Sequence, residues 1–432
     1  MTGSLRRASA FAGVATLALT APILGRAAPV PFALIGVLAL AVTEGRLFEL
    51  FARPGDRKAG RLTGLAGFAF AATGLAVVTI VGLPVDVFAA AIVLTGYGNL
   101  AVEGIRPRED HPLVRVSAFA IVGGLAALVA LYLVPLLGGT ALPSLPVAIF
   151  LAVSGALLGA LVRAVFLARE DALVLVAVAL LLWLFTDLAV AVTVQRVTLA
   201  LGVTLLFGYT SYALDAASVP GMVTGVLLGV LAVVLGGFWW FAILFTFFGV
   251  GGLSTKYGYE RKLERGVAEE DGGARGSGNV LGNSLAAIVA LLLFAAQPRL
   301  PVGPLVFQFA FAGSVATALG DTLSSEIGGL FDGPRLLTSL EPVEPGTDGA
   351  ITWQGELAGV IGTGIIGGLA ALAFGSGVVG IAVTMLGGFT GMTTDSLVGA
   401  TLEGERIGNQ SVNFVATAAG GVAGGLLALL IL

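Results

Sequence analysis

Long apolar runs recur along nearly the whole chain, and they constrain its fold more than any other feature. About fifteen windows of roughly 17 to 25 mostly apolar residues are each long enough to cross a ~30 Å hydrocarbon layer. Hydrophobic side chains make up 57% of the 432 residues and charged ones 11%, with a mean hydropathy of +1.01. Soluble domains carry about 25% charged residues. The sequence therefore predicts an all-α fold, a polytopic transmembrane helix bundle of about 15 spans.

Basic residues are distributed unevenly between the connections of these windows. When the N-terminus is placed in the cytoplasm, all but three of the 22 lysines and arginines fall on the cytoplasmic side, the exceptions being Arg26, Arg196 and Arg299. This asymmetry follows the positive-inside rule. It predicts a cytoplasmic N-terminus and a multi-pass integral protein of the cell membrane.

The N-terminal segment and the composition bear on several classes of protein. Arg6 and Arg7 followed by an apolar run are similar to a secretory signal peptide, but the next apolar run begins almost at once, near Pro29, which favours a first spanning helix. The sequence contains no cysteine, which excludes thiolate catalysis and thiolate metal sites. The absence of a polybasic run indicates that nucleic acid is not a ligand.

Loop lengths divide the windows into two sets. Short connections join the windows of residues 1–190, whereas residues 191–432 carry longer polar loops at 255–278, 321–352 and 395–410. We expect residues 1–190 to form an N-terminal module of about seven helices whose role is unknown, and residues 191–432 a domain of about eight helices, both surrounded by membrane lipids. The polar motifs of the second set lie on the predicted cytoplasmic side.

Two of these polar segments flank helices. Lys256 belongs to a basic segment, residues 254–262, which is typical of a snorkelling anchor and is also a candidate for phosphate contact. Residues 276–284 form a glycine-rich approach to a helix start and contain Asn279 and Asn283. Backbone N–H groups and the positive end of a helix dipole favour an anion at such a place.

Residues 320–328 put carboxylates and hydroxyls where a long apolar helix meets water. A continuous helix would place Asp321 and Ser325 four residues apart on one face, with Thr322 and Glu326 on the adjoining face. This oxygen-rich group suits Mg²⁺, which takes one or two carboxylates and completes its shell with water and phosphate oxygens. The alternative is that the carboxylates only solvate a helix end.

Another apolar window is predicted to end at the same depth with Asp395 and Ser396. Asp321 and Asp395 are therefore expected to meet across the bundle at the membrane surface. We expect Asp321, Glu326 and Asp395 to hold the metal ion, while Arg335 and the 279–283 segment contact phosphates. These parts suit phosphoryl transfer, which depends on positioning and charge neutralisation.

In this order, the polar segments resemble those of a multi-pass membrane family that includes the plant phytyl-phosphate kinase of the vitamin E pathway and animal transmembrane protein nineteen. The resemblance begins near residue 206 and continues to the end, a little over half of the chain. It is carried by residues 256–262, 278–283, 321–328, 334–335, 346–347 and 395–401. As an ordered series this pattern is specific.

The resemblance implies a kinase that converts a prenyl-type monophosphate lipid, such as phytyl or geranylgeranyl phosphate, into the diphosphate with Mg²⁺ and a nucleoside triphosphate. CTP is the expected donor and ATP the alternative, because the Gly-Asp and Asp-Ser elements look like those of CTP-using dolichol and phytol kinases. The implied substrate- and nucleotide-binding residues are Lys256, Asn279, Asn283, Thr322, Ser325, Gly346, Thr347 and Ser396. The isoprenoid tail is expected between glycine-rich helices. The four-residue glycine spacings at 355–359, 364–368 and 420–425 predict close packing of helices within the bundle.

The chain departs from the family pattern at two places. Residues 320–326 read Gly-Asp-Thr-Leu-Ser-Ser-Glu where the family has Ala-Asp-Thr-Trp-Ala-Ser-Glu. Glu341 stands where the family has a lysine, which removes a cation near the expected triphosphate site.

Two other functions remain open. A transporter or lipid flippase would also suit many helices and glycine-rich packing, although ion-coupled carriers normally keep an ionisable group near the bilayer midplane. Here the charged residues within the predicted spans lie close to an end, which favours the kinase. A scaffold without turnover is the third possibility.

Overall fold

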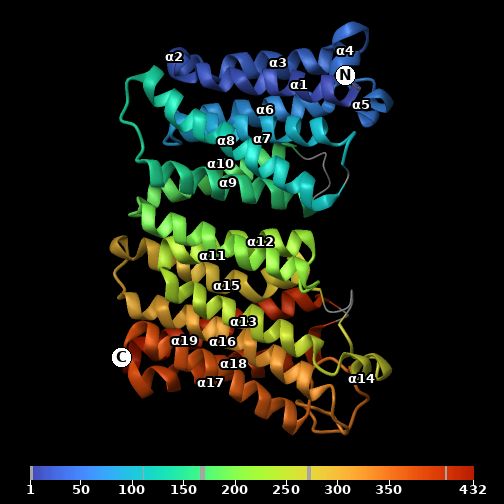
Figure 1. The fold of residues 1–432 in the computed structure, drawn as a ribbon, viewed down its shortest axis with the longest axis vertical. Helices are drawn as coiled ribbons and strands as arrows, with labels where there is room; N and C mark the ends of the chain where they lie inside the picture. Colours follow the sequence, from blue (N-terminus) through green and yellow to red (C-terminus); the bar gives the residue numbers. More distant parts are fainter. Residues whose placement is uncertain (1–2, 110, 166–170, 270–273, 404–405) are drawn as a thin grey trace. The chain divides into compact units, whose positions relative to one another are not determined.

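The fold is almost entirely α-helical (Figure 1). The described residues add one short antiparallel strand pair. The computed structural model describes residues 3–109, 111–165, 171–269, 274–403 and 406–432. The chain divides into two compact units, Met1–Val197 and Thr198–Leu432, and the division falls inside α11 (Val194–Ala213). The prediction of an all-α, polytopic helical membrane protein is confirmed.

Among the described residues, 12 helices are long and apolar enough to cross a membrane, or 13 when one bent pair counts as a single span. The difference from the expected fifteen lies in three windows. α3 (Pro29–Ala41) and α4 (Gly45–Phe51) are bent by 107° at their break, where Gly45 has a φ of +85°. α6 (Thr63–Val78) has only 16 residues, and α11 is not among the twelve.

The first unit is built around α7 (Val85–Ile105), which packs against α1 (Gly3–Thr16), α8 (Pro112–Gly138) and α10 (Asp171–Leu188). Residues 87–94 of α7 are all buried, as expected for a helix that neighbours surround on every side. The other helices of this unit are α2 (Ala21–Leu24), α3, α4, α5 (Pro54–Ala59), α6 and α9 (Leu145–Val165).

A buried polar network ties helix ends together in this unit. The carboxylate of Asp171 accepts hydrogen bonds from the Arg53 guanidinium and, at 2.9 Å, from the side-chain amide of Asn99. The oxygen of the same amide accepts a bond from Arg163. The guanidinium carbon of Arg53 lies 5.1 Å from the centre of the Phe11 ring, a cation–π contact.

The second unit is built around α16 (Pro304–Gly328), which packs against α13, α15, α17, α18 and α19. Besides most of α11, its helices are α12 (Val219–Leu231), α13 (Phe238–Lys256), α14 (Tyr259–Glu264), α15 (Ser277–Ala296), α17 (Trp353–Phe374), α18 (Gly377–Leu402) and α19 (Asn409–Ile431). A π-helical turn at Ala232–Gly236 follows α12. β1 (Arg335–Leu336) pairs antiparallel with β2 (Ala350–Ile351) in the connection between α16 and α17.

Glycines bring α16, α18 and α19 into backbone contact. A Cβ atom on Gly313 would lie 2.5 Å from the carbonyl oxygen of Gly420, and one on Gly387 would lie 2.9 Å from the same oxygen. By contrast, a Cβ on Gly364 would meet atoms only at 3.8 Å or more, and nothing lies within 4 Å of that on Gly368. The close packing that the glycine spacing predicts is therefore confirmed at the Gly420 crossing, where the helix backbones touch.

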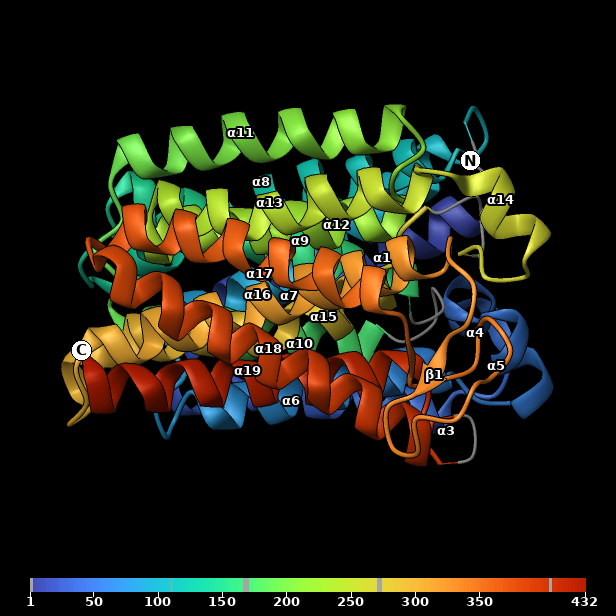
Figure 2. The same ribbon diagram turned by 90° about the horizontal axis from the view of Figure 1, so that it is seen from below.

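Alternating directions bring several helix ends of the second unit to one place. α13, α16 and α18 end there, while α15, α17 and α19 begin there. α14 and the β1–β2 pair lie at this same end, opposite the C-terminus of the chain (Figure 2). The polar segments of the sequence are thus gathered at one end of the second unit.

Candidate functional site

A polar cavity of about 430 Å³ lies where these helix ends meet. Most of the site residues expected from the sequence line it, namely Asn279, Asn283, Asp321, Thr322, Ser325, Glu326, Gly346, Thr347, Asp395 and Ser396. They come from α15, α16, the loop before β2, and α18. The fold therefore brings together segments that are far apart in the chain.

Two carboxylates meet in the cavity. The side chains of Asp321 on α16 and Asp395 on α18 line the same cavity and interact electrostatically, each about two helical turns before the end of its helix. Gly320 permits this crossing, because a Cβ there would lie 2.6 Å from the sulfur of Met392. Two neighbouring carboxylates repel each other unless a proton or a cation is shared between them.

The N-termini of α15 and α19 form another wall. Asn279 and Asn283 line the cavity from α15, and Asn409 and Asn413 line it from α19. The N-cap residue is a glycine in both helices, Gly276 and Gly408, so in the described structure no N-cap side chain accepts from the first-turn N–H groups. A Cβ on Gly282 would lie 2.8 Å from the carbonyl oxygen of Gln410, so the glycines of the 276–284 segment also allow these two helices to touch.

The loop before β2 forms part of the cavity wall. Gly346 and Thr347 line it, and the Thr347 hydroxyl donates to the carbonyl oxygen of Glu344 at 2.8 Å. Gly349, with a φ of +73°, packs against the backbone of α18 at Ser396, where a Cβ would collide. Glycine at this position therefore fixes the loop beside the Asp395 end of α18.

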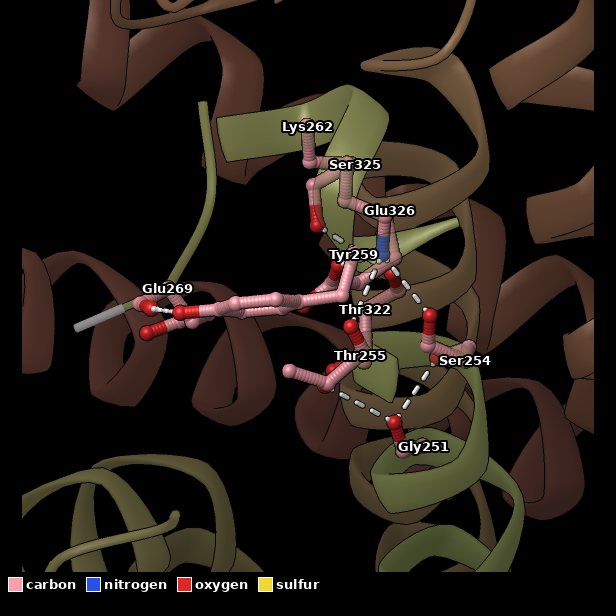
Figure 3. A network of polar contacts seen from close by, with 9 residues as sticks. All are labelled: Gly251, Ser254, Thr255, Tyr259, Lys262, Glu269, Thr322, Ser325 and Glu326. Atoms are coloured by element: carbon pink, nitrogen blue, oxygen red, sulfur yellow. Dashed lines mark hydrogen bonds and ion pairs between the residues drawn. The ribbon is translucent and has the colours of Figure 1, made fainter. Parts of the chain in front are cut away.

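Glu326 lines the cavity but is bound to a buried lysine (Figure 3). The Lys262 ammonium donates to Glu326 Oε2 at 2.5 Å and to the carbonyl oxygens of Ser254 and Thr255 at 2.8 and 3.1 Å. The Lys262 side chain is 1% exposed and that of Glu326 8%. Lys262 thus caps the end of α13 and joins α14 to α16.

The expected three-carboxylate metal set is therefore not assembled. Glu326 faces Lys262, and the described residues contain no group of three or more His, Cys, Asp or Glu side chains arranged to hold a metal. The Asp321–Asp395 pair remains suitable for Mg²⁺, which commonly takes one or two carboxylates and keeps several waters. Asp395 Oδ1 fits this role because it is buried without a hydrogen-bond partner in the described structure.

Arg335 and Lys256 lie outside the cavity lining found for the described residues. Arg335 is exposed, and its guanidinium donates to the carbonyl oxygen of Leu340 at 2.7 Å. The exposed Lys256 ammonium donates to the carbonyl oxygen of Leu214 at 2.5 Å. The structure therefore does not bring these two cations to the other candidate residues.

Comparison with known proteins places the second unit in a family. Residues 202–422 match the family described as integral membrane protein DUF92. An uncharacterized membrane protein of Methanocaldococcus jannaschii is 37% identical over 214 residues, which cover 48% of this chain and 84% of that protein. The chain belongs to the integral membrane protein DUF92 family. This confirms the family resemblance of the ordered polar segments.

Two Arabidopsis thaliana proteins are also similar. The protein named PGR is 30% identical over 230 residues, covering 48% of this chain and 79% of PGR. The chloroplastic protein VTE6 is 34% identical over 145 residues, covering 33% of this chain and 44% of VTE6. No solved structure matches the chain significantly.

The cavity of this DUF92 protein contains residues that the sequence reasoning did not select. Arg275 lines it just before α15, and Glu403 lines it just after α18. The sequence did contain a signal for Arg275. This cation lies directly before the glycine-rich segment that was predicted to bind an anion. Glu403 carried no comparable signal.

Two charged groups outside the membrane-spanning helices have pKa values that differ from their ordinary ones. Burial raises the pKa of Glu403, and the nearby Asp348 carboxylate adds to this rise while a hydrogen bond with Asn409 opposes it. Burial also lowers the pKa of Arg275, partly offset by Glu269 and Glu326. An arginine remains protonated at physiological pH in spite of such a shift, so the described cavity lining includes the half-buried cation Arg275 beside several carboxylates.

Proposed function

We propose that this protein is an isoprenoid-phosphate kinase that transfers a phosphoryl group from a nucleoside triphosphate to a lipid monophosphate. The observation that carries the proposal is the juxtaposition of Asp321 and Asp395 in a cavity that also receives the N-termini of α15 and α19. A carboxylate pair for a cation and open N–H groups for anions are the two elements that phosphoryl transfer needs.

The geometry gives each group a role. Asp321 and Asp395 would hold Mg²⁺, which supplies neutralisation of the charge on the phosphate oxygens. Asn279, Asn283 and the Gly346–Thr347 turn line the same cavity and would orient the phosphates. An oxygen of the lipid monophosphate attacks the terminal phosphorus of the donor, the bond to the bridging oxygen breaks, and the nucleoside diphosphate leaves.

The donor proposed is CTP, with ATP as the alternative, because the resemblance of the polar segments points to CTP-using lipid kinases. Glu341, which replaces the lysine of the family pattern, is exposed in the β1–β2 connection and does not belong to the described cavity lining. The replacement therefore leaves the residues around the carboxylate pair unchanged. A cytoplasmic location of the cavity would give a soluble nucleotide access to a lipid substrate.

Transport is the second candidate, and one observation favours it. Asp321 and Asp395 lie about two turns inside their helices rather than at the last residue, and carboxylates within a membrane span also serve ion-coupled carriers. A carrier would move an isoprenoid lipid or an ion across vesicles without forming a diphosphate. The two functions therefore differ in their product.

The test is to incubate the purified, detergent-solubilised protein with geranylgeranyl monophosphate, Mg²⁺ and either CTP or ATP, and to detect the diphosphate by mass spectrometry. The kinase predicts a diphosphate product that Asp321→Asn reduces at least about 100-fold, since the metal-binding carboxylate is lost. Asp332→Asn is the matched control, because this carboxylate is exposed and pairs with Arg265 at 2.6 Å. No diphosphate from folded protein with either donor would overturn the proposal.

A further inference from the structure

Arg275 is held in the cavity wall by contacts on several sides. Its backbone N–H donates to the carbonyl oxygen of Ala216 at 3.0 Å, and its own carbonyl oxygen accepts from the N–H of Ser218 at 3.2 Å. Its guanidinium carbon lies 4.8 Å from the centre of the buried Phe247 ring on α13. The connection between α11 and α12 thus fixes the backbone of Arg275, and α13 fixes its guanidinium.

Two glycines make room for Arg275. A Cβ atom on Gly251 would lie 2.7 Å from Arg275 Nη2, and one on Gly221 would collide with the Arg275 carbonyl oxygen. Any larger residue at either position would displace the arginine. Glycine at these two positions therefore leaves the space that the backbone and the guanidinium of Arg275 occupy.

One nitrogen of this guanidinium has no acceptor among the described residues. Arg275 Nη1 is buried and has no hydrogen-bond partner in the described structure, while the residue lines the cavity. The Glu326 carboxylate, one of the two that act electrostatically on Arg275, is already bound to Lys262. A buried charged donor without an acceptor is costly, and an oxygen-rich anion in the cavity would satisfy it.

The start of α15 directly follows Arg275 in the chain and lines the same cavity through Asn279. Asn279 Oδ1 is buried without a hydrogen-bond partner in the described structure and, as an acceptor, requires a donor rather than an anion. Because Arg275 directly precedes this uncapped helix start, its cationic side chain and the N-terminal N–H groups of α15 favour the same sign of ligand charge. The Asp321–Asp395 pair provides the complementary cation-binding wall of the cavity.

We propose that Arg275 is the residue that anchors a phosphate group of one substrate in this cavity, with Phe247 as the platform that orients its guanidinium. The role in turnover depends on the proposed kinase function, whereas binding of a phosphate group does not. Planar guanidinium groups suit this task because they donate two parallel hydrogen bonds to phosphate oxygens.

The test measures protection of the full-length, detergent-solubilised protein from thermal unfolding by inorganic pyrophosphate. The wild type is expected to be protected, and Arg275→Gln to need roughly 10- to 100-fold more pyrophosphate for the same shift, since a charge-assisted hydrogen bond is lost. Arg275→Lys should be intermediate, because it keeps the charge without the paired donors. Undiminished protection of Arg275→Gln, or no protection of the wild type, would overturn the proposal.

Arg265→Gln is the matched control, because its guanidinium already binds Asp332 Oδ1 at 2.6 Å and the carbonyl oxygen of Phe331 at 2.7 Å. It should retain wild-type protection by pyrophosphate. Phe247→Leu keeps an apolar side chain beneath the guanidinium, and it should weaken pyrophosphate binding while the protein remains folded. If the Arg275 variants fail to fold, Phe247→Leu still tests the proposal, because it leaves Arg275 itself unchanged.

The source of the phosphate is distinguished by repeating the measurement with geranylgeranyl monophosphate and with CTP. If Arg275→Gln loses thermal protection by the lipid monophosphate alone, Arg275 binds the phosphate of the acceptor. If it loses protection by CTP alone, Arg275 binds a phosphate of the donor. In the diphosphate assay, the same variant should raise KM for that substrate alone. Protein that binds pyrophosphate through Arg275 but forms no diphosphate would contradict the kinase and support the anchor.

Discussion

The ammonium nitrogen of Lys262 lies 2.5 Å from Oε2 of Glu326, and both side chains are almost fully enclosed (Figure 3). Two carbonyl oxygens at the end of α13 complete the environment of the lysine. The pair therefore connects three helices of the second unit. A buried ion pair of this kind makes the loss of one partner costly, because the other charge is left without compensation.

Lys262→Met should destabilise the protein by about 3–5 kcal/mol, because it leaves the Glu326 carboxylate buried and unpaired. Combining it with Glu326→Leu should cost less than the sum of the two single changes, since the double variant buries no isolated charge. Unfolding by sodium dodecyl sulfate, followed by circular dichroism, measures these differences. Strict additivity of the two changes would show that the pair is not coupled.

Mg²⁺ should raise the unfolding temperature of the wild type, because a ligand that binds only the folded state stabilises it. Asp395→Asn should remove most of this shift, since Asp395 Oδ1 is a buried carboxylate oxygen without a hydrogen-bond partner in the described cavity. Asp332→Asn should preserve the shift, because the Asp332 side chain is 86% exposed and pairs with Arg265. An equal Mg²⁺ effect in all three proteins would place the ion elsewhere.

Glycines inside and outside a helix crossing should respond oppositely to alanine. Gly313→Ala should cost roughly 1–3 kcal/mol, because the new methyl group would lie 2.5 Å from the Gly420 carbonyl oxygen and force α16 and α19 apart. Gly368→Ala should stabilise α17 by roughly 0.5–1 kcal/mol, since no atom lies within 4 Å and alanine favours helix. Detergent-unfolding midpoints compare the two variants, and destabilisation by Gly368→Ala would indicate a helix contact there.

The pH dependence of the stability of the protein should reflect the titration of the Glu403 carboxyl group. Its pKa is raised by burial, so the folded state favours the protonated form, and the resulting stabilisation is present below the ordinary glutamate value of ~4.3. This stabilisation is lost as the pH rises through the folded value. Glu403→Gln should therefore be more stable than the wild type at neutral pH, and the difference should vanish under acidic conditions.

Unfolding midpoints measured from about pH 4 to about pH 8 follow this difference. Glu341→Gln is the matched control, because Glu341 is exposed in the β1–β2 connection. It should follow the wild type throughout. A Glu403→Gln advantage that is independent of pH would contradict the assignment to titration of Glu403.

Asp171 should be important for the stability of the first unit. Asp171→Asn should cost roughly 3 kcal/mol, because the Arg53 guanidinium loses its buried carboxylate. Glu49→Gln removes a carboxylate from a pair with Arg57 whose side chains are 59% and 52% exposed, and it should cost less than about 1 kcal/mol. Unfolding curves of the two variants provide the measurement, and equal costs would show that the Asp171 network adds little.

Much of the architecture could be predicted because hydropathy is a local property. The apolar windows predicted most of the spans, and the failures have local causes, such as the turn at Gly45 that bends α3 away from α4. The common depth of Asp321 and Asp395 was also readable, since both follow long apolar runs. Glycine spacing was less informative, because the same spacing packs tightly at Gly420 and faces open space at Gly368.

The sequence by itself determined that the chain crosses a membrane many times and that its polar segments gather at one end of the second unit. The tertiary structure alone decided which of them interact. It turned Glu326 toward Lys262, and it placed Arg275 in the cavity while Arg335 stayed outside. These choices depend on the rotation of each helix and on glycine contacts between distant segments, and neither is contained in the composition of a single window.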